Sequence, residues 1–228
     1  EDTFYSECAV TSARMAPFVY PEFTARFYCG NTIPDRVLRA LAVTGADVRV
    51  MTQTASSPFA GLFWRFLPFD DSDVDVVLVR DVDSPLLPRE RGAVDAWLAG
   101  DRPFHVLRDH VQHNAPMLAG LWGGFTGLLR PLGPAMSKYL AQDTTRFADQ
   151  RFLRQFVWPR IRQATLAIDS HYSLGETIDF PGLAGRAAAQ CVRPRPAGRR
   201  APRRRLLAHA DPSGSEAPPG GPLHGRGV

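Results

Sequence analysis

"VVLVRDVDSPL", residues 76–86, places four apolar residues directly before an arginine and two aspartates. A short apolar run bounded by turn residues is typical of a buried strand. Asp81 and Asp83 follow its end, and residues two apart in an extended segment point to the same side. Carboxylates that face one way repel each other. The pattern therefore indicates either a hard divalent cation between them, Mg²⁺ or Mn²⁺, or a solvated turn whose aspartates cap a helix.

Helical and extended patterns alternate on both sides of this stretch. Helices are predicted over residues 4–20, 34–45, 57–69, 88–100 and 146–161, and strands over 24–30, 46–51, 74–80, 103–109 and 164–170. Ser57 is a candidate N-cap, followed by Pro58 at the first helical position. Such alternation favours an α/β domain with a central, mostly parallel sheet. Ligands of these folds bind at the carboxyl ends of strands, where Asp81 and Asp83 are expected.

Length and composition indicate a globular protein and argue against membrane, secreted and disulfide-rich classes. The chain has 228 residues, 44% of them apolar, which fits one domain of ordinary size or a domain with a tail. Its apolar runs are far shorter than the roughly 20 residues of a membrane-spanning helix, and its acidic N-terminus lacks a signal-peptide pattern. Cys8, Cys29 and Cys191 form neither a zinc pattern nor a disulfide framework. We therefore expect no transmembrane segment and a cytoplasmic location.

Residues 186–228 differ from the rest of the chain. They contain nine arginines and two acidic residues, a net charge of +7, so the chain's total of +4 leaves −3 on residues 1–185. Seven prolines, six glycines and little apolar periodicity predict a disordered tail that packs against nothing. An arginine-rich nucleic-acid arm is an alternative. A shifted reading frame is another, because Lys138 is the only lysine beside 26 arginines and indicates a GC-rich gene. No nucleic-acid partner is expected.

Two enzyme classes place Asp-x-Asp after an apolar strand. The opening motif of haloacid-dehalogenase-like phosphatases resembles "VLVRDVDSPL", with Asp81 as nucleophile and Asp83 as general acid. That motif normally lies on the first strand of its domain, whereas at least two strand–helix units precede it here. The class also needs a downstream basic residue and a paired acidic motif, and "FADQRF" offers a single acid.

The other class is the nucleotide-sugar glycosyltransferases of the GT-A type. "GLFWRFLPFDDSDVDVVLVRDVDS" resembles their shared segment: an aromatic and arginine-containing helix, an acidic turn, an apolar strand and Asp-x-Asp. Downstream, "LAGLWGG" (118–124) resembles their Gly-rich acceptor-side strand, and "ADQRFL" (148–153) resembles the motif that opens a late helix. The chain is especially similar to the glycogenin and lipopolysaccharide galactosyltransferase group and to bacterial and viral relatives. The resemblance covers about residues 5–175.

The resemblance implies a Rossmann-like, mostly parallel sheet flanked by helices over residues 1–185. It also implies transfer of a sugar from a nucleotide-sugar donor to a glycan or other hydroxyl acceptor, with Mn²⁺ or Mg²⁺ as cofactor. Related enzymes begin with a strand that cradles the nucleotide base, whereas this sequence starts at the helix after it. The domain is therefore expected to lack its first strand.

Donor and metal roles follow from the resemblance. It implies that Asp83 ligates the metal and that Asp81 contacts the metal or the donor ribose. Arg65 lies near the donor or the aspartates, or else covers an apolar surface with its stem. The family's further metal ligand, a histidine, is matched by His171, although the order "IDSHYS" departs from the family pattern.

Acceptor and catalytic roles follow in the same way. Gly120, Trp122 and Gly123 match an acceptor platform, or else a buried Trp with turn glycines. His110 ends a strand and is a candidate acceptor contact. Asp149 and Gln150 match the group that faces the reacting sugar, although Asp149 is also a candidate N-cap.

Two further possibilities are a zinc site among the histidines and a role outside enzymology. His105, His110 and His113 lack the spacing of a zinc site, because one is expected on a strand and the others in a loop. Outside enzymology, the alternative to a glycosyltransferase is an inactive fragment or a sugar-binding domain without turnover.

Overall fold

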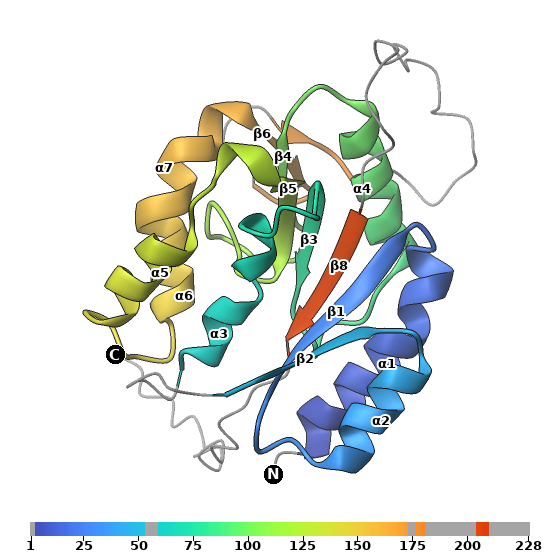
Figure 1. Ribbon diagram of the computed structural model, residues 1–228. Coiled ribbons are helices and arrows are strands. Elements are labelled where there is room, and N and C mark those ends of the chain that lie inside the picture. Colours follow the sequence, from blue (N-terminus) through green and yellow to red (C-terminus); the bar gives the residue numbers. More distant parts are fainter. Residues whose placement is uncertain (1–2, 53–58, 173–176, 181–203, 210–228) are drawn as a thin grey trace, which may run out of the picture.

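The computed structural model describes residues 3–52, 59–172, 177–180 and 204–209 as an α/β sandwich around one sheet (Figure 1). The eight described strands follow the order β2-β1-β8-β3-β5-β4-β6-β7. Their bounds are β1 (Phe23–Gly30), β2 (Asp47–Met51), β3 (Val76–Arg80), β4 (Phe104–Arg108), β5 (Leu121–Phe125), β6 (Thr165–Asp169), β7 (Thr177–Ile178) and β8 (Arg204–His209). Among them β5 runs antiparallel to both neighbours, and the other pairs are parallel. The predicted α/β class is confirmed.

Helices cover both faces of the sheet. On one face, α1 (Thr3–Val19), α2 (Asp35–Val43) and α4 (Pro88–Ala99) pack on a core that includes Phe27, Val76 and Leu78. The other face carries a core around Phe66, Val77 and Trp122. It is covered by α3 (Gly61–Trp64), α5 (Gly133–Leu140), α6 (Ala148–Phe152) and α7 (Trp158–Ile161). Among the described residues, no helix is long and apolar enough to cross a membrane.

Strand β3 contributes to both cores. Val76 and Leu78 face the α1 side, whereas Val77 and Val79 face the α6 side. All four have no exposed surface, which explains why the strand reads as a continuous apolar run rather than an alternating one. Asp81 follows its carboxyl end, as the sequence predicts.

Two predicted helices differ from the structure. Residues 57 and 58, the expected N-terminus of the first, lie outside the described residues. The part that is described divides into α3 and a 3-10 turn, Leu67–Phe69, with Pro68 near the start of that turn. The segment 146–161 is helical from Ala148 but contains a π-helical stretch, Leu153–Val157, just before Pro159. Proline cannot donate the usual backbone bond, so the helix changes its winding beside it.

The prediction that the chain beyond residue 186 packs against nothing is wrong for residues 204–209. They form β8, which pairs in parallel with β1 from Phe23 to Tyr28 and with β3 from Val76 to Arg80. Backbone N–H and C=O groups can pair whatever the composition of the segment, which is why an arginine- and proline-rich context concealed this strand. The expected boundary near residue 186 lies outside the described residues.

Trp122 is the side chain that we expect to matter most for the stability of the α6-side core. It has no exposed surface, and its ring stacks on Phe69 with 4.7 Å between centroids. Trp122→Ala should lower the free energy of unfolding by about 3–5 kcal/mol because it leaves a large cavity. Urea unfolding measures this. Leu128→Ala, at a side chain that is 67% exposed, is the control and should change stability by less than about 0.5 kcal/mol. Equal effects would contradict the assignment.

Candidate functional site

The Arg65 guanidinium joins two aspartates at the carboxyl end of β3. Its Nη1 donates to Asp81 Oδ1, and its Nη2 donates to Asp149 Oδ2 over 3.1 Å. Arg65 Nε also donates to the Leu62 carbonyl at 2.9 Å, which holds the side chain against its own helical turn. The three charged residues come from the end of α3, the loop after β3 and the start of α6. Arg65 therefore lies beside the aspartates, one of the positions that the sequence left open.

Burial raises the electrostatic cost of ionising the carboxyl groups of this cluster. Arg65 is 3% exposed and Asp149 is 5% exposed. Burial raises the pKa of Asp149, and the nearby Arg65 only partly opposes that rise. Asp83 is exposed at the rim of the cluster, yet partial loss of hydration and the charge of Asp81 both raise its pKa. One guanidinium faces three carboxylates when all are ionised, so the group carries a formal charge of −2.

Gly120 allows the loop before β5 to approach Asp81 closely. A β-carbon at position 120 would overlap the Asp81 carboxylate and would lie 2.8 Å from the Asp81 backbone nitrogen. Gln150 holds the same loop from α6. Its Oε1 accepts the Ala119 N–H at 3.0 Å, and its Nε2 donates to the Met117 carbonyl at 2.5 Å. Gly120 and Gln150 thus shape the site from two sides.

The predicted acceptor platform does not form from Trp122 and Gly123. The Trp122 ring is fully buried between Phe66 and Phe69, so it cannot stack on a sugar. Gly123 lies in the middle of β5, where an added β-carbon would meet the Val77 carbonyl at 2.5 Å and His105 Cε1 at 2.6 Å. The tight packing of neighbouring strands therefore explains this glycine.

The predicted metal set of Asp81, Asp83 and His171 is not brought together. Among the residues that the structure describes, no group of three or more His, Cys, Asp or Glu side chains lies close enough to hold a metal ion. His171 instead donates its backbone N–H to Asp169 Oδ1 at 2.8 Å, in the turn after β6. Asp81 and Asp83 remain together at the end of β3.

His105 lies in β4, and His110 and His113 lie in the loop after it. His110 is exposed in the loop after β4, where its Nδ1 accepts the Gln112 N–H and its ring meets that of His113 edge to face. His105 is buried against Trp97, with 4.3 Å between ring centroids, and burial lowers its pKa well below the usual value.

Sequence reasoning missed a buried network directly below Asp81. Arg80 donates its Nε to Glu90 Oε1 of α4 at 2.5 Å, and Tyr20, the residue after α1, donates its hydroxyl to the same oxygen at 2.5 Å. Arg80 Nη1 also donates to the carbonyls of Val79 and Trp122. The signal in the sequence was an arginine at the end of a strand buried on both faces, because such a charge needs a carboxylate partner.

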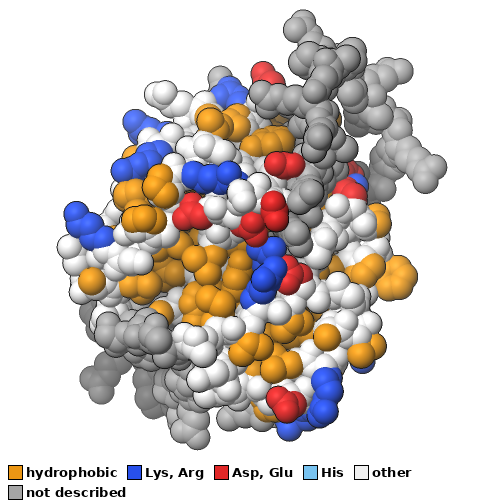
Figure 2. All heavy atoms as spheres, viewed as in Figure 1, with side chains coloured by type: hydrophobic (Ala, Val, Ile, Leu, Met, Phe, Trp, Pro, Cys, Tyr) orange, Lys and Arg blue, Asp and Glu red, His pale blue; other side chains and the backbone are white. Residues whose placement is uncertain are grey.

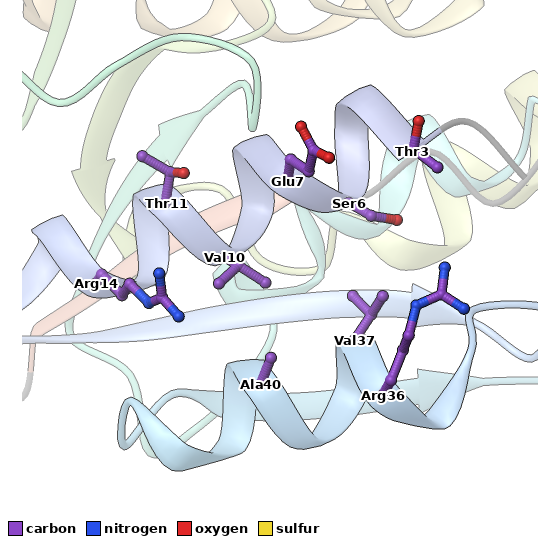
Figure 3. Close-up of a pocket in the computed structure, with 9 residues that line it drawn as sticks. All are labelled: Thr3, Ser6, Glu7, Val10, Thr11, Arg14, Arg36, Val37 and Ala40. Carbon is purple, nitrogen blue, oxygen red and sulfur yellow. The ribbon is translucent and has the colours of Figure 1, made fainter.

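Acidic and basic side chains lie side by side near the middle of the face seen in Figure 2, next to an apolar area. A separate groove of about 470 Å³ lies between α1 and α2 (Figure 3), and its lining includes Glu7, Arg14 and Arg36. This groove shares no lining residue with the Arg65 cluster. The cluster is therefore the stronger candidate site, because Arg65 and Asp149 are buried and its charged side chains converge from three segments.

No family model, curated protein or solved structure matched this chain.

We predict that Gly120→Ala disturbs the cluster. The new methyl group would overlap the Asp81 carboxylate and crowd its backbone nitrogen, so rotation of the side chain alone does not relieve the contact. The loss should be about 1–3 kcal/mol in urea unfolding. Gly127→Ala is the matched control, since a β-carbon there meets nothing within 4 Å. A Gly120→Ala loss no larger than the control's would show that the close approach does not constrain the site.

We also predict a pH-dependent effect of Asp83→Asn in buffer without divalent cations. A carboxyl group whose pKa is raised on folding destabilises the folded state progressively as pH rises above the unfolded value of about 3.9. The variant should therefore be more stable than the parent at pH 7.5 and lose that advantage near pH 4. Asp101→Asn, before the amino end of β4, controls for removal of a surface charge. An advantage that is absent at pH 7.5, or larger at pH 4, would contradict the prediction.

Proposed function

We propose that this chain is a GT-A-type glycosyltransferase domain that binds a nucleotide-sugar donor through a divalent cation at Asp81 and Asp83. The observation that carries the proposal is the cluster at the carboxyl end of a central strand, in which Arg65 pairs with Asp81 and Asp149 and the charge of Asp81 acts on the nearby Asp83. Ligands of open α/β sheets bind at such strand ends. The cluster's formal charge of −2 is complementary to Mn²⁺ or Mg²⁺.

The residues fit such a cation as a shared site. Mg²⁺ in phosphate-handling sites is commonly held by one or two carboxylates together with substrate phosphates and water. Two aspartates are then sufficient protein ligands when a diphosphate supplies further oxygens. Asp81 Oδ1 already accepts from Arg65, so Asp83 is the better candidate for direct contact. When bound, the cation would act as a Lewis acid and stabilise the negative charge of the departing nucleoside diphosphate.

Arg65, Asp149 and Gln150 would position the site's side chains and the donor sugar. Arg65 holds Asp81 and Asp149 in fixed positions, since a guanidinium can donate to two carboxylates at once. Asp149 is the candidate group that faces the reacting sugar. Both ends of the Gln150 amide are engaged by the loop at Met117 and Ala119, so we assign Gln150 a positioning role rather than a catalytic one.

The alternatives are supported less well. A haloacid-dehalogenase-like phosphatase needs Asp81 as an unencumbered nucleophile, whereas its carboxylate is paired with Arg65. A sugar-binding domain without turnover is compatible with the same cluster. Hydrolysis or transfer assays with a set of nucleotide sugars separate this last alternative from an enzyme.

Metal-dependent nucleotide binding gives the main test. Mn²⁺ together with UDP or GDP should raise the melting temperature, because a ligand at 100 times its dissociation constant stabilises the folded state by about 2.7 kcal/mol. Asp83→Asn should abolish that increase, and Asp101→Asn should keep it. Thermal unfolding followed by circular dichroism measures both variants. Asp83→Asn with the full increase would place the binding elsewhere, and a parent without any increase would argue against the proposed function.

A further inference from the structure

Strand β8 is the link between the two halves of the sheet. Strands β1 and β3 are not neighbours, and each pairs with β8 instead. Without β8, the described strands would separate into a pair, β2 and β1, and a group of five from β3 to β7. The flanking strands are almost entirely buried, so an empty slot would leave a row of unpaired backbone groups inside the protein, which is costly.

Helix α1 spans this slot on one face. It contacts both β1 and β8, and Ser12 Oγ donates to the Val82 carbonyl just beyond β3 at 3.2 Å. Tyr20, the residue after α1, donates its hydroxyl to Glu90 of α4. Figure 1 shows α1 beside β1 and β8, with its first residues at the end of the sheet to which the arrow of β8 points. These contacts connect α1 to residues on both sides of the slot.

The occupant of the slot comes from a distant part of the chain. Strand β7 ends at Ile178 on the far edge of the sheet, and the next described strand, β8, lies in its centre. The connection covers residues 179–203, and closing so long a connection has an entropic cost. The pairing itself is made by the main chain, as in complexes where an extended peptide adds a strand to a sheet.

We propose that the space between β1 and β3 is a strand-acceptor site that binds an extended segment parallel to both strands, and that residues 204–209 of the same chain are its exchangeable occupant. The occupant is recognised mainly by its backbone. A peptide of the same sequence therefore competes with the chain's own strand. This inference does not depend on the proposed function.

Disulfide trapping tests the register. Val76 and Arg204 are parallel partners, and neighbouring strands are about 4.8 Å apart, within the range that a disulfide spans. In a full-length chain whose own cysteines are replaced, Val76→Cys with Arg204→Cys should form an intrachain disulfide that peptide mass mapping detects. The control pair is Val76→Cys with Leu223→Cys. Equal yields for both pairs, or crosslinks found solely between two chains, would overturn the assignment to the same chain.

Peptide exchange tests the slot itself. Leu207→Pro removes a backbone donor from β8 and should empty the slot. A fluorescent peptide of residues 201–210, "APRRRLLAHA", should then bind the variant about tenfold or more tightly than the parent, where the tethered strand competes at a high effective concentration. A peptide with the same proline substitution should not bind. Equal binding of both peptides, or no binding to a variant that circular dichroism shows to be folded, would overturn the proposal. Should Leu207→Pro not fold, the disulfide experiment decides.

Discussion

Strand β3 is buried on both faces and carries no charged side chain before its last residue, and this limits where a polar site can form beside it. Val76 and Leu78 serve one core, while Val77 and Val79 serve the other. Charge begins at Arg80, which needs Glu90 and Tyr20 as partners, and continues with Asp81. The central position of β3 thus determines where the two helical layers meet and where a polar site can form.

In the cluster beyond β3, the negative charge of the aspartates is only partly compensated. Arg65 compensates part of the negative charge of Asp81 and Asp149 inside the protein, yet burial still raises the pKa of Asp149. Asp83 stands outside this pairing, and the charge of Asp81 helps to raise its pKa. An arrangement that holds more carboxylates than cations costs stability unless a ligand supplies positive charge. This is the physical basis for proposing a cation and a diphosphate at this end of the sheet.

Local patterns predicted most of the elements, and the exceptions have physical causes. The strand from 74 to 80 and the helix from 88 to 100 follow directly from apolar runs and from a proline at a helix start. The segment 57–69 reads as one helix, but Pro68 lies in a separate 3-10 turn. Helix α5, Gly133–Leu140, was not predicted from the sequence. Its first turn is held by Asp70, which accepts the backbone N–H groups of Leu132 and Gly133 from 62 and 63 residues away.

The sequence by itself determined the alternation of elements, the buried character of β3 and the position of Asp81 and Asp83 at its end, because these depend on side-chain patterns within a few residues. Only the tertiary structure decided that Arg65 joins Asp81 to Asp149, that Trp122 belongs to the core, and that His171 lies apart from the aspartates. It also placed residues 204–209 in the centre of the sheet. Their composition predicts disorder, but a strand between two partners is held by its main chain, and composition does not encode which backbone groups are left to pair.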